Sequence, residues 1–355
     1  MTVRRLSTRL LLQPGDVPAS RDDFEVVGVF NPGAVRAGDE VVLLVRVAER
    51  PRERRPAFTG LPRWDPAGGL TIDWVPDAEL EPIDPRVVRR KADELVRLTF
   101  TSHLRVVRCG DGRTVREITA VTFRPQSEVE EFGVEDPRIT PLNGKYYFSY
   151  VAVSRHGPAT ALASTSDFRT FDRHGVVFCP ENKDVVLFPE KVGGAFAALH
   201  RPVCGTPFTR PEMWVARSPD LIHWGAHTPL TVSGGEWQSG RVGAGTPPVR
   251  VSGGWLEIYH GNRHPTRLGE VGTYYGGAIL LDANDPAKVL RRTPEPFFRP
   301  AAEFEVSGFV PNVVFPTGMV QDGDTLLIYY GAADAVTAVV EFDRRKLLDV
   351  MTAPD

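Results

Sequence analysis

The sequence predicts an all-β fold, a five-bladed β-propeller that forms a single domain over residues 1–355. Short apolar or alternating runs recur along the chain, each opened by a turn, and such runs are typical of strands. Glycine and proline are frequent, with 33 and 31 residues, as expected for a fold with many turns. The runs recur about every 50 residues with hardly any helical periodicity, which is the pattern of propeller blades. A β-sandwich with accidental spacing is the alternative.

Two kinds of element define this repeat. The predicted strands are Gly38–Arg46, Asp93–Phe100, Gly144–Tyr150, Gly194–Leu199, Gly254–Tyr259 and Gly323–Tyr330. A turn built on an aspartate falls between some of them, at Asp111, Asp167 and Asp220, which lie 56 and 53 residues apart. Two elements with a similar interval favour an array of equivalent units.

Residues 49–75 interrupt the pattern. The segment opens with the charge-rich run Glu49–Pro56 and shows no strand alternation as far as Val75. We therefore expect an inserted loop with a solvated face. Loops from all blades of a propeller meet at one end of its central channel, so polar residues distant in sequence are expected to form one pocket there.

Charge and cysteine content exclude several functions. The 42 Lys and Arg against 45 Asp and Glu give a net charge of −3, which offers no basic field for nucleic acid. The three cysteines include no Cys-x-x-Cys pair, so neither a disulfide framework nor a zinc site is indicated. The N-terminal apolar run is too short for a signal peptide, and no stretch reaches membrane-spanning length. We expect a cytoplasmic protein without a membrane partner.

Candidate functional residues gather in loops that combine carboxylates, cations and aromatic side chains. These loops are residues 30–34, 133–138, 182–191, 200–202, 237–245, 259–261, 274–276 and 330–334. They contain no serine elbow, phosphate loop or cluster of metal ligands, so we expect neither a metal nor a cofactor. Aromatic faces and carboxylate hydrogen bonds are the features of a sugar site.

These loops, in this order, resemble glycoside hydrolase family 130, the β-mannoside phosphorylases, from about residue 24 to residue 345. The strings that carry the resemblance are Gly-Val-Glu-Asp-Pro-Arg, Asn-Lys-Asp-x-x-Leu-Phe-Pro-Glu-Lys, Arg-Val-Gly-Ala-Gly-x-Pro-Pro, Gly-Trp-Leu-x-Ile-Tyr-His-Gly and Tyr-Tyr-Gly-Ala-Ala-Asp. The resemblance implies a five-bladed propeller that cleaves a β-mannosidic bond with inorganic phosphate and inverts the anomeric centre to give α-mannose 1-phosphate. Its partners are then a β-mannoside and phosphate, and the chain is compatible with a homo-oligomer.

The resemblance places Asp136 on the family's catalytic acid, which is thought to act through the mannose 3-hydroxyl. An inverting hydrolase needs two carboxylates about 6.5–9.5 Å apart, whereas a phosphorylase needs only the acid because phosphate is the nucleophile. A simple turn residue before Pro137 is the alternative for Asp136. A second Asp-Pro-Arg string, at Asp84–Arg86, lacks the Gly-Val-Glu lead, and we interpret it as an equivalent position without function.

Phosphate requires fixed cations and hydrogen-bond donors. The resemblance assigns Lys183, Arg201 and Arg241 to phosphate binding, with His260 and Tyr274 beside them. Arg241 stands where many members carry lysine, a change that keeps the charge and alters the donor geometry. Each cation taken alone is also compatible with an ordinary surface charge.

The mannose subsite is assigned by the same resemblance. Asn31, Arg46 and Asp334 match positions that bind sugar hydroxyls, although a turn, a structural ion pair and a bridge between blades are their respective alternatives. Glu135 and Arg138, on either side of the predicted acid, are included among the substrate-binding residues, with Glu135 as a hydrogen-bond partner rather than a base.

Glu305 lies in a string similar to the family's Tyr-Glu-x-x-Gly and is also predicted to bind substrate. Phe304 replaces the usual tyrosine, which removes a hydroxyl from the acceptor side.

Two other functions stay open at this stage. Members of the same family that replace the phosphate cations and recruit a glutamate base are inverting β-mannosidases, and a propeller lectin would bind mannosides without turnover. The cation set and Asp136 favour the phosphorylase. β-1,2-Mannobiose or longer β-1,2-mannooligosaccharides are the first-choice substrates, with mannosyl-glucose or mannosyl-glucosamine next. We expect the subsite for the acceptor sugar to be built from variable loops that include residues 49–75.

Overall fold

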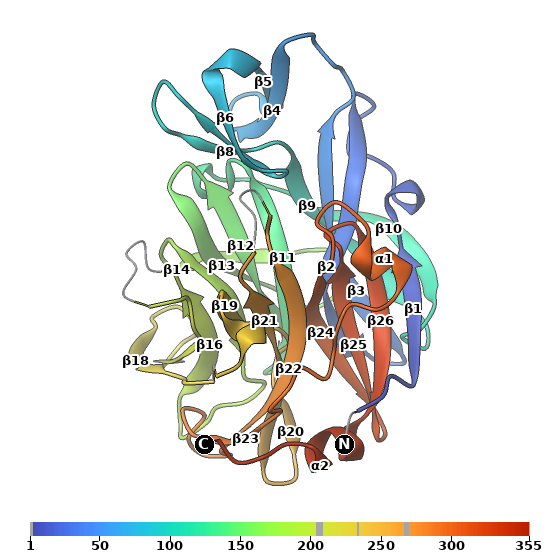
Figure 1. Cartoon of the computed structure of the whole chain (residues 1–355), viewed down its shortest axis with the longest axis vertical. Helices are drawn as coiled ribbons and strands as arrows, with labels where there is room; N and C mark the ends of the chain where they lie inside the picture. The colour runs from blue at the N-terminus through green and yellow to red at the C-terminus, as the bar shows by residue number, and fades with distance from the viewer. Residues whose placement is uncertain (1–2, 204–208, 233, 266–269, 355) are drawn as a thin grey trace.

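The computed structural model describes residues 3–203, 209–232, 234–265 and 270–354, and this part of the chain is all-β (Figure 1). The prediction of an all-β fold is therefore confirmed. Its helices are the short α1 (Glu303–Val306) and α2 (Arg344–Asp349), with single 3₁₀ turns η1 (Pro14–Asp16), η2 (Asp77–Glu79), η3 (Glu128–Glu130) and η4 (Glu236–Gln238).

Within the described residues, five larger antiparallel sheets follow one another along the chain. The first contains β2 (Phe24–Ala37), β3 (Glu40–Pro51), β9 (Thr101–Cys109) and β10 (Val115–Phe123). The second contains β11 (Gly133–Leu142), β12 (Lys145–Ser154), β13 (Gly157–Thr165) and β14 (Asp172–Phe178). The third contains β15 (Asn182–Leu187), β16 (Phe196–Pro202), β17 (Trp214–Ser218) and β18 (Gly225–Pro229).

The fourth and fifth sheets complete this series. The fourth contains β19 (Arg241–Ala244), β21 (Gly254–Arg263), β22 (Thr273–Leu281) and β23 (Val289–Arg292), and β20 (Val249–Val251) also pairs with β21. The fifth contains β24 (Val314–Asp322), β25 (Thr325–Ala332) and β26 (Val336–Asp343), and β1 (Ser7–Leu12) is its outer strand. The N-terminal strand thus joins the last sheet of the chain.

Apolar side chains fill the space between each pair of neighbouring sheets. Between the first and second sheets these are Leu44 and Phe148, and between the second and third they are Leu162 and Leu187. Val215 and Trp255 pack between the third and fourth sheets, and Ile258 and Ile328 between the fourth and fifth. Leu43 and Tyr329 pack between the fifth sheet and the first. All ten are almost completely buried, so burial of apolar surface holds each sheet against both of its neighbours.

Five of the six predicted strands form the second strand of a large sheet: β3, β12, β16, β21 and β25. Asp93–Phe100 is the exception. Its first residues form a turn in which Asp93 pairs with Arg90, and the short β8 (Val96–Leu98) follows in a separate small sheet. In this run Phe100 is buried whereas Val96 is 46% exposed, so its apolar residues do not share one buried face as those of an equivalent strand would.

The repeated aspartate turns are equivalent in the structure. Asp111, Asp167 and Asp220 each lie between the third and fourth strands of their sheet, and each carboxylate accepts a backbone N–H two residues further on, at 2.9, 2.8 and 2.9 Å. Asp282 has the same place in the fourth sheet and accepts the N–H of Asn284 at 2.9 Å. Such a turn satisfies backbone donors that the tight connection leaves unpaired.

The expectation of a loop without strands at residues 49–75 is wrong. After β3 ends, the chain forms the hairpin of β4 (Phe58–Asp65) and β5 (Gly69–Pro76). A second small sheet follows, made of β6 (Leu80–Asp84), β7 (Val87–Arg90) and β8. We call residues 58–98 the extension, and Figure 1 shows it at one end of the long axis. Most side chains of this hairpin are half-buried, and Leu61, Pro62 and Val75 are the buried ones. The two strands therefore lack the alternation of buried and exposed residues by which a strand is recognised in a sequence.

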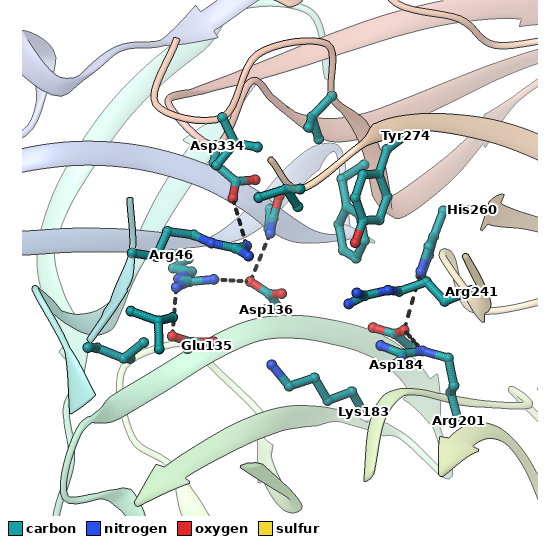
Figure 2. Close-up of a pocket in the computed structure, with 18 of the residues that line it drawn as sticks. Arg46, Glu135, Asp136, Lys183, Asp184, Arg201, Arg241, His260, Tyr274 and Asp334 are labelled. Atoms are coloured by element: carbon teal, nitrogen blue, oxygen red, sulfur yellow. Dashed lines mark hydrogen bonds and ion pairs between the residues drawn. The ribbon is translucent and has the colours of Figure 1, made fainter. Parts of the chain in front are cut away.

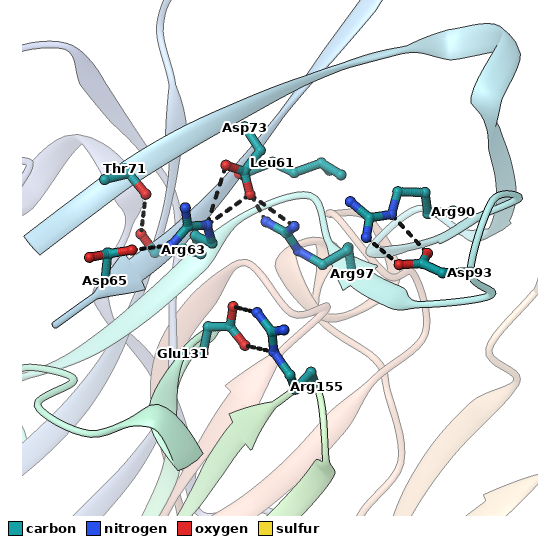
Figure 3. A network of polar contacts seen from close by, with 10 residues as sticks. All are labelled: Leu61, Arg63, Asp65, Thr71, Asp73, Arg90, Asp93, Arg97, Glu131 and Arg155. Carbon is teal, nitrogen blue, oxygen red and sulfur yellow. Dashed lines mark hydrogen bonds and ion pairs between the residues drawn. The ribbon is translucent and has the colours of Figure 1, made fainter. Parts of the chain in front are cut away.

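Charged side chains fix the extension internally and to the second sheet (Figure 3). Asp73 on β5 accepts hydrogen bonds from Arg63 on β4 and Arg97 on β8, both at 3.0 Å. Arg97 is buried, donates to the carbonyl of Leu61 at 3.1 Å, and lies 4.7 Å from the ring of Phe132, next to β11. These contacts hold the two small sheets as one unit against the body.

No helix in the described residues is long and apolar enough to cross a membrane. Cys109 is buried and Cys179 is exposed, and both are free thiols, whereas Cys204 lies outside the described residues.

Candidate active site

A polar pocket is lined by side chains from the first strand of every large sheet (Figure 2). These residues are Asn31 on β2, Asp136 on β11, Lys183 and Asp184 on β15, Arg241 on β19 and Phe315 on β24. Residues that lie far apart in the sequence thus face one cavity. The expectation of a single pocket formed from several repeats is confirmed.

Backbone bulges turn three of these side chains into the pocket. Asn31, Asp136 and Asp184 have φ angles of 50°, 48° and 56°, in the left-handed region. Each lies where the register between the first and second strands of its sheet shifts. Asn and Asp adopt this conformation more readily than other non-glycine residues, and bulges commonly redirect a side chain beside an active site. Three sheets therefore present a polar residue at the same structural position.

Asp136 is held by two basic or amide groups. Arg46 donates from Nη1 to Asp136 Oδ1 at 2.8 Å and from Nη2 to Glu135 Oε1 at 2.6 Å. Nδ2 of Asn31 donates to the same Asp136 oxygen at 2.9 Å. The Arg46 guanidinium lies 4.6 Å from the ring of Phe30, which restricts it further. The carboxylate of Asp136 therefore has a fixed orientation towards the cavity.

Two carboxyl groups in the pocket have pKa values displaced in opposite directions. Burial by itself raises the pKa of Asp136, but Arg46, Arg138 and the Asn31 amide outweigh it, so the net pKa lies below the ordinary value. Burial raises the pKa of Asp334, and there the nearby Arg86 and Arg46 do not fully compensate. In the free protein Asp136 is therefore ionised at neutral pH.

Positive charge gathers on the other side of the pocket. Asp184 accepts from Nε of Arg201 at 2.6 Å and lies 3.4 Å from both Nη2 of Arg138 and Nε2 of His260. Despite burial, these groups hold its pKa well below the ordinary range. Lys183 and Arg241 form no ion pair with any carboxylate of the described residues. This side therefore carries uncompensated positive charge.

Unsatisfied polar atoms at the pocket indicate a ligand with hydrogen-bonding groups. Burial lowers the pKa of His260 to about 3, so its ring is neutral and keeps one donor and one acceptor nitrogen. Neither ring nitrogen of His260 forms a hydrogen bond within the described part of the chain, and Oδ1 of Asn31 has none either. Buried polar atoms without partners are costly, and a bound polar molecule would satisfy them.

A family model described as beta-1,4-mannooligosaccharide phosphorylase, of glycoside hydrolase family 130, matches residues 85–353. The chain belongs to glycoside hydrolase family 130. The beta-1,2-mannobiose phosphorylase of Listeria innocua is 39% identical and the match covers 95% of each chain. The 1,2-beta-oligomannan phosphorylase of a Thermoanaerobacter species is 36% identical over 67% of this chain and 77% of its own. The solved Listeria enzyme in complex with beta-1,2-mannobiose has a TM-score of 0.89, with 39% identity and coverage of 96% of each chain.

Ten of the twelve residues that the family resemblance selects line this pocket. They are Asn31, Arg46, Glu135, Asp136, Lys183, Arg201, Arg241, His260, Tyr274 and Asp334. Arg138 lies directly behind them, almost fully buried, and donates to the carbonyl oxygens of Asp136 at 2.7 Å and Gly245 at 3.2 Å. Arg138 thus connects the two sides of the pocket from beneath, and its predicted contact with substrate stays a prediction.

Glu305 lies outside the pocket. Its carboxylate accepts hydrogen bonds from Arg5 and Tyr330 at 2.7 and 2.6 Å, and from the N–H groups of Ala301 and Ala302 at 2.7 and 2.9 Å. These bonds use its acceptor capacity to fix the start of α1 to the fifth sheet. The expected placement at the substrate is therefore corrected, because the string that contains Glu305 folds into a helix cap.

Two charged residues that line the pocket received no role from the sequence. Asp184 repeats the bulged position of Asn31 and Asp136, and its place in the Asn-Lys-Asp string was a usable signal. Arg86 also lines the pocket, and it lies between β6 and β7 of a small sheet, so the interpretation of Asp84–Arg86 as a position equivalent to Asp136 is wrong. Its sequence context gave no signal, since the turn between β6 and β7 approaches the pocket only through the tertiary fold.

Buried histidines make the stability of the protein sensitive to acid. Burial lowers the pKa of His200 to about 3, and His227 adds to the effect. Because this value lies below the unfolded value of about 6.5, the unfolded chain binds the proton more tightly, and stability is lost as pH falls below about 6.5. Burial similarly lowers the pKa of His103 and His260 to about 3, whereas it raises that of Glu257 to about 8, which acts in the opposite direction.

We expect the His200→Phe variant to lose less stability in acid than the wild type. The phenyl ring fits beside Phe178, whose ring centroid lies 4.7 Å from that of His200, and has no proton to gain. Between pH 8 and pH 5 the variant should lose about 2 kcal/mol less unfolding free energy. Urea unfolding at several pH values measures this difference, and equal pH slopes for the two proteins would contradict it.

Proposed function

We propose that this protein is an inverting phosphorylase that cleaves a β-1,2-mannosidic bond with inorganic phosphate and releases α-mannose 1-phosphate. The observation that carries the proposal is that one cavity contains both the fixed carboxylate of Asp136 and the two cations Lys183 and Arg241. Neither cation has a carboxylate partner among the described residues. The names of the Listeria and Thermoanaerobacter relatives support the mannoside and the 1,2 linkage. β-1,2-Mannobiose or a longer β-1,2-mannooligosaccharide is the proposed substrate.

In this mechanism the cationic side of the pocket binds phosphate. Arg241 and Lys183 supply charge, Arg201 supplies a guanidinium that Asp184 orients, and neutral His260 and Tyr274 donate hydrogen bonds. A phosphate oxygen attacks C1 of the mannosyl unit from the face opposite the glycosidic oxygen. The C1–O bond breaks, its electron pair stays on the leaving oxygen, and the new C1–O–P bond has inverted configuration.

The leaving oxygen takes a proton that originates on Asp136. Asp136 is ionised in the free protein, so the carboxyl must be protonated when both substrates are bound. Phosphate brings negative charge into the cavity and opposes the effect of Arg46 and Arg138, which raises the pKa of Asp136. Binding of the nucleophile therefore prepares the acid. Asn31, Arg46 and Asp334 are the proposed partners of the mannose hydroxyls, with Glu135 holding Arg46.

The other carboxylates of the pocket support phosphorolysis rather than hydrolysis. Water activation requires a second carboxylate that is free to accept a proton. Glu135 is bound to Arg46 and Asp184 to Arg201, and Asp334 lies on the side of Asp136 away from the cations that bind the proposed nucleophile. Phosphate is already an anionic nucleophile and needs no such base.

Product analysis tests this function. We expect incubation with β-1,2-mannobiose to yield equimolar mannose and α-mannose 1-phosphate with inorganic phosphate, and no cleavage when phosphate is omitted. In the reverse direction, α-mannose 1-phosphate and mannose should release phosphate. Equal release of mannose in phosphate-free buffer would contradict the phosphorylase and favour a mannosidase, and binding without any cleavage would favour a lectin.

The proposal includes the architecture expected from the sequence. Five sheets that each pack on two neighbours, with the fifth against the first, support a single-domain five-bladed β-propeller closed by β1. The pocket at the first strands then lies at the central channel. A cytoplasmic location and a reaction that uses no cofactor besides the co-substrate phosphate complete the proposal.

A further inference from the structure

The extension supplies part of the pocket wall. Arg86 and Val87, at the turn between β6 and β7, and Leu98, at the end of β8, line the cavity beside Phe100. Residues 49–75 are all described, and none of them lines it. The segment expected to build the acceptor subsite therefore does not reach the pocket, whereas the turn between β6 and β7 and the end of β8 do.

Arg86 is held in place before any sugar binds. Its backbone N–H and its Nη2 donate to Asp84 at 2.8 and 2.9 Å, and its carbonyl accepts the N–H of Thr99 at 3.0 Å. Nη1 lies 3.4 Å from Oδ2 of Asp334, so the extension and the fifth sheet meet through this pair. The network around Asp73 and Arg97 braces the extension behind it (Figure 3).

The guanidinium of Arg86 keeps unused hydrogen-bond donors. An arginine has five N–H groups, and the contacts of Nε and Nη2 with Asp84 and of Nη1 with Asp334 use three of them. Its side chain is 29% exposed, against 14% for Asp334 and 13% for Asp136, so Arg86 lies closer to solvent than either carboxylate. It therefore offers charged donors to a group that sits nearer the mouth of the pocket.

The side of the pocket on which Arg86 lies is the side of the leaving group. Figure 2 shows Asp334 and Arg46 on one side of Asp136, and Lys183, Arg201 and Arg241 on the other. If phosphate binds to the cations, inversion requires the departing sugar to lie on the opposite face of the anomeric carbon. Asp334, and with it Arg86, is on that face.

We propose that Arg86 binds the acceptor sugar, the unit that leaves when the bond is cleaved. Its free N–H groups donate to hydroxyls of this neutral hexose, and Val87, Leu98 and Phe100 contact the apolar C–H face of the ring. This inference rests on the proposed phosphorylase function. It makes the extension the element that selects the acceptor, whereas residues of the five large sheets bind the mannosyl unit and phosphate.

Kinetics of the reverse reaction test the assignment, with α-mannose 1-phosphate as donor, mannose as acceptor and released phosphate as the readout. We expect Arg86→Ala to raise the KM for mannose by about tenfold and to change the KM for α-mannose 1-phosphate by less than about twofold. Arg86→Lys keeps a charge beside Asp334 but loses the planar donor set, and it should also raise the acceptor KM. Arg89→Ala is the matched control, because Arg89 is on the same hairpin, is 44% exposed and contacts Glu81 outside the pocket.

Other outcomes overturn the assignment. If both KM values rise by similar factors, Arg86 acts by positioning Asp334 in the mannose subsite. If neither value changes, Arg86 binds no sugar. Absence of phosphate release by the wild type with every acceptor would instead refute the proposed function itself. Arg86→Lys keeps a positive charge beside Asp84 and Asp334, and the backbone hydrogen bonds of the turn are unaffected, so it still decides the question if Arg86→Ala fails to fold.

Discussion

Replacement of Asp136 by asparagine is expected to lower kcat by about 10²–10⁴-fold, the range that general acid catalysis contributes. The amide matches the carboxylate in size and keeps a hydrogen-bonding oxygen for Arg46, whose Nη1 lies 2.8 Å from Oδ1 in the wild type. It has no proton to give to the glycosidic oxygen. Initial rates at saturating phosphate and mannoside measure the loss, and an unchanged melting temperature shows that the fold is retained.

Asp334→Asn is the matched control for this experiment. Asp334 lines the same pocket, and burial raises its pKa, which makes it the rival proton donor. If Asp136 is the acid, Asp334→Asn should weaken mannoside binding with a smaller effect on kcat. Retention of more than a tenth of the activity by a folded Asp136→Asn protein, together with a larger loss in Asp334→Asn, would move the acid to Asp334. Asp84, the other candidate from the sequence, is bound to Arg86 and does not line the pocket.

Replacement of Arg241 by alanine is expected to raise the KM for phosphate by about ten- to a hundredfold. A hydrogen bond to a charged group contributes about 1.5–3 kcal/mol, and Arg241 has no carboxylate partner among the described residues that would share its charge. Arg201 already donates to Asp184 at 2.6 Å, so Arg201→Ala should also disturb the orientation of Asp184. Phosphate titrations at saturating mannoside measure the change.

Affinity for the mannoside in the absence of phosphate should change much less in Arg241→Ala, because a cation aimed at phosphate offers little to neutral hydroxyls. Asn31→Ala should show the reverse pattern. Arg250→Ala provides the control, since Arg250 stacks on Trp255 at 4.9 Å and does not line the pocket. Weaker mannoside binding with an intact phosphate dependence in Arg241→Ala would show that the anion subsite lies elsewhere.

The position of most pocket residues follows from local patterns. A strand that is interrupted by an asparagine or aspartate in the left-handed conformation bulges by itself, and the strings around Asn31 and Asp136 place a proline directly after that residue. Five of the six strands that define the repeat also follow from alternation and from the turn before them. The strands and the family strings that contain Asn31 and Asp136 each depend on a few consecutive residues, which is why the sequence predicts them, whereas the bulges are seen only in the structure.

Contacts between distant segments account for the errors. Glu305 matches a substrate-binding string, yet its carboxylate accepts hydrogen bonds from Tyr330 and from Arg5, which is 300 residues away in the chain. The same carboxylate also binds the start of α1. The hairpin at residues 58–76 is stabilised by charged pairs and a small apolar cluster rather than by a continuous buried face. Local hydrophobicity therefore indicated a loop.

By itself the sequence determined five of the six repeated strands and, through its family strings, the chemical types of most of the polar residues that line the pocket, because each of these is encoded in a short segment. Only the tertiary structure decided which charges are compensated: Arg201 is paired with Asp184, and Lys183 and Arg241 are not paired with any described carboxylate. It also decided that Arg86 reaches the pocket and that Glu305 does not. The reason is physical, since the strength of an ion pair and the exposure of a side chain depend on groups that the chain brings together only when the five sheets pack.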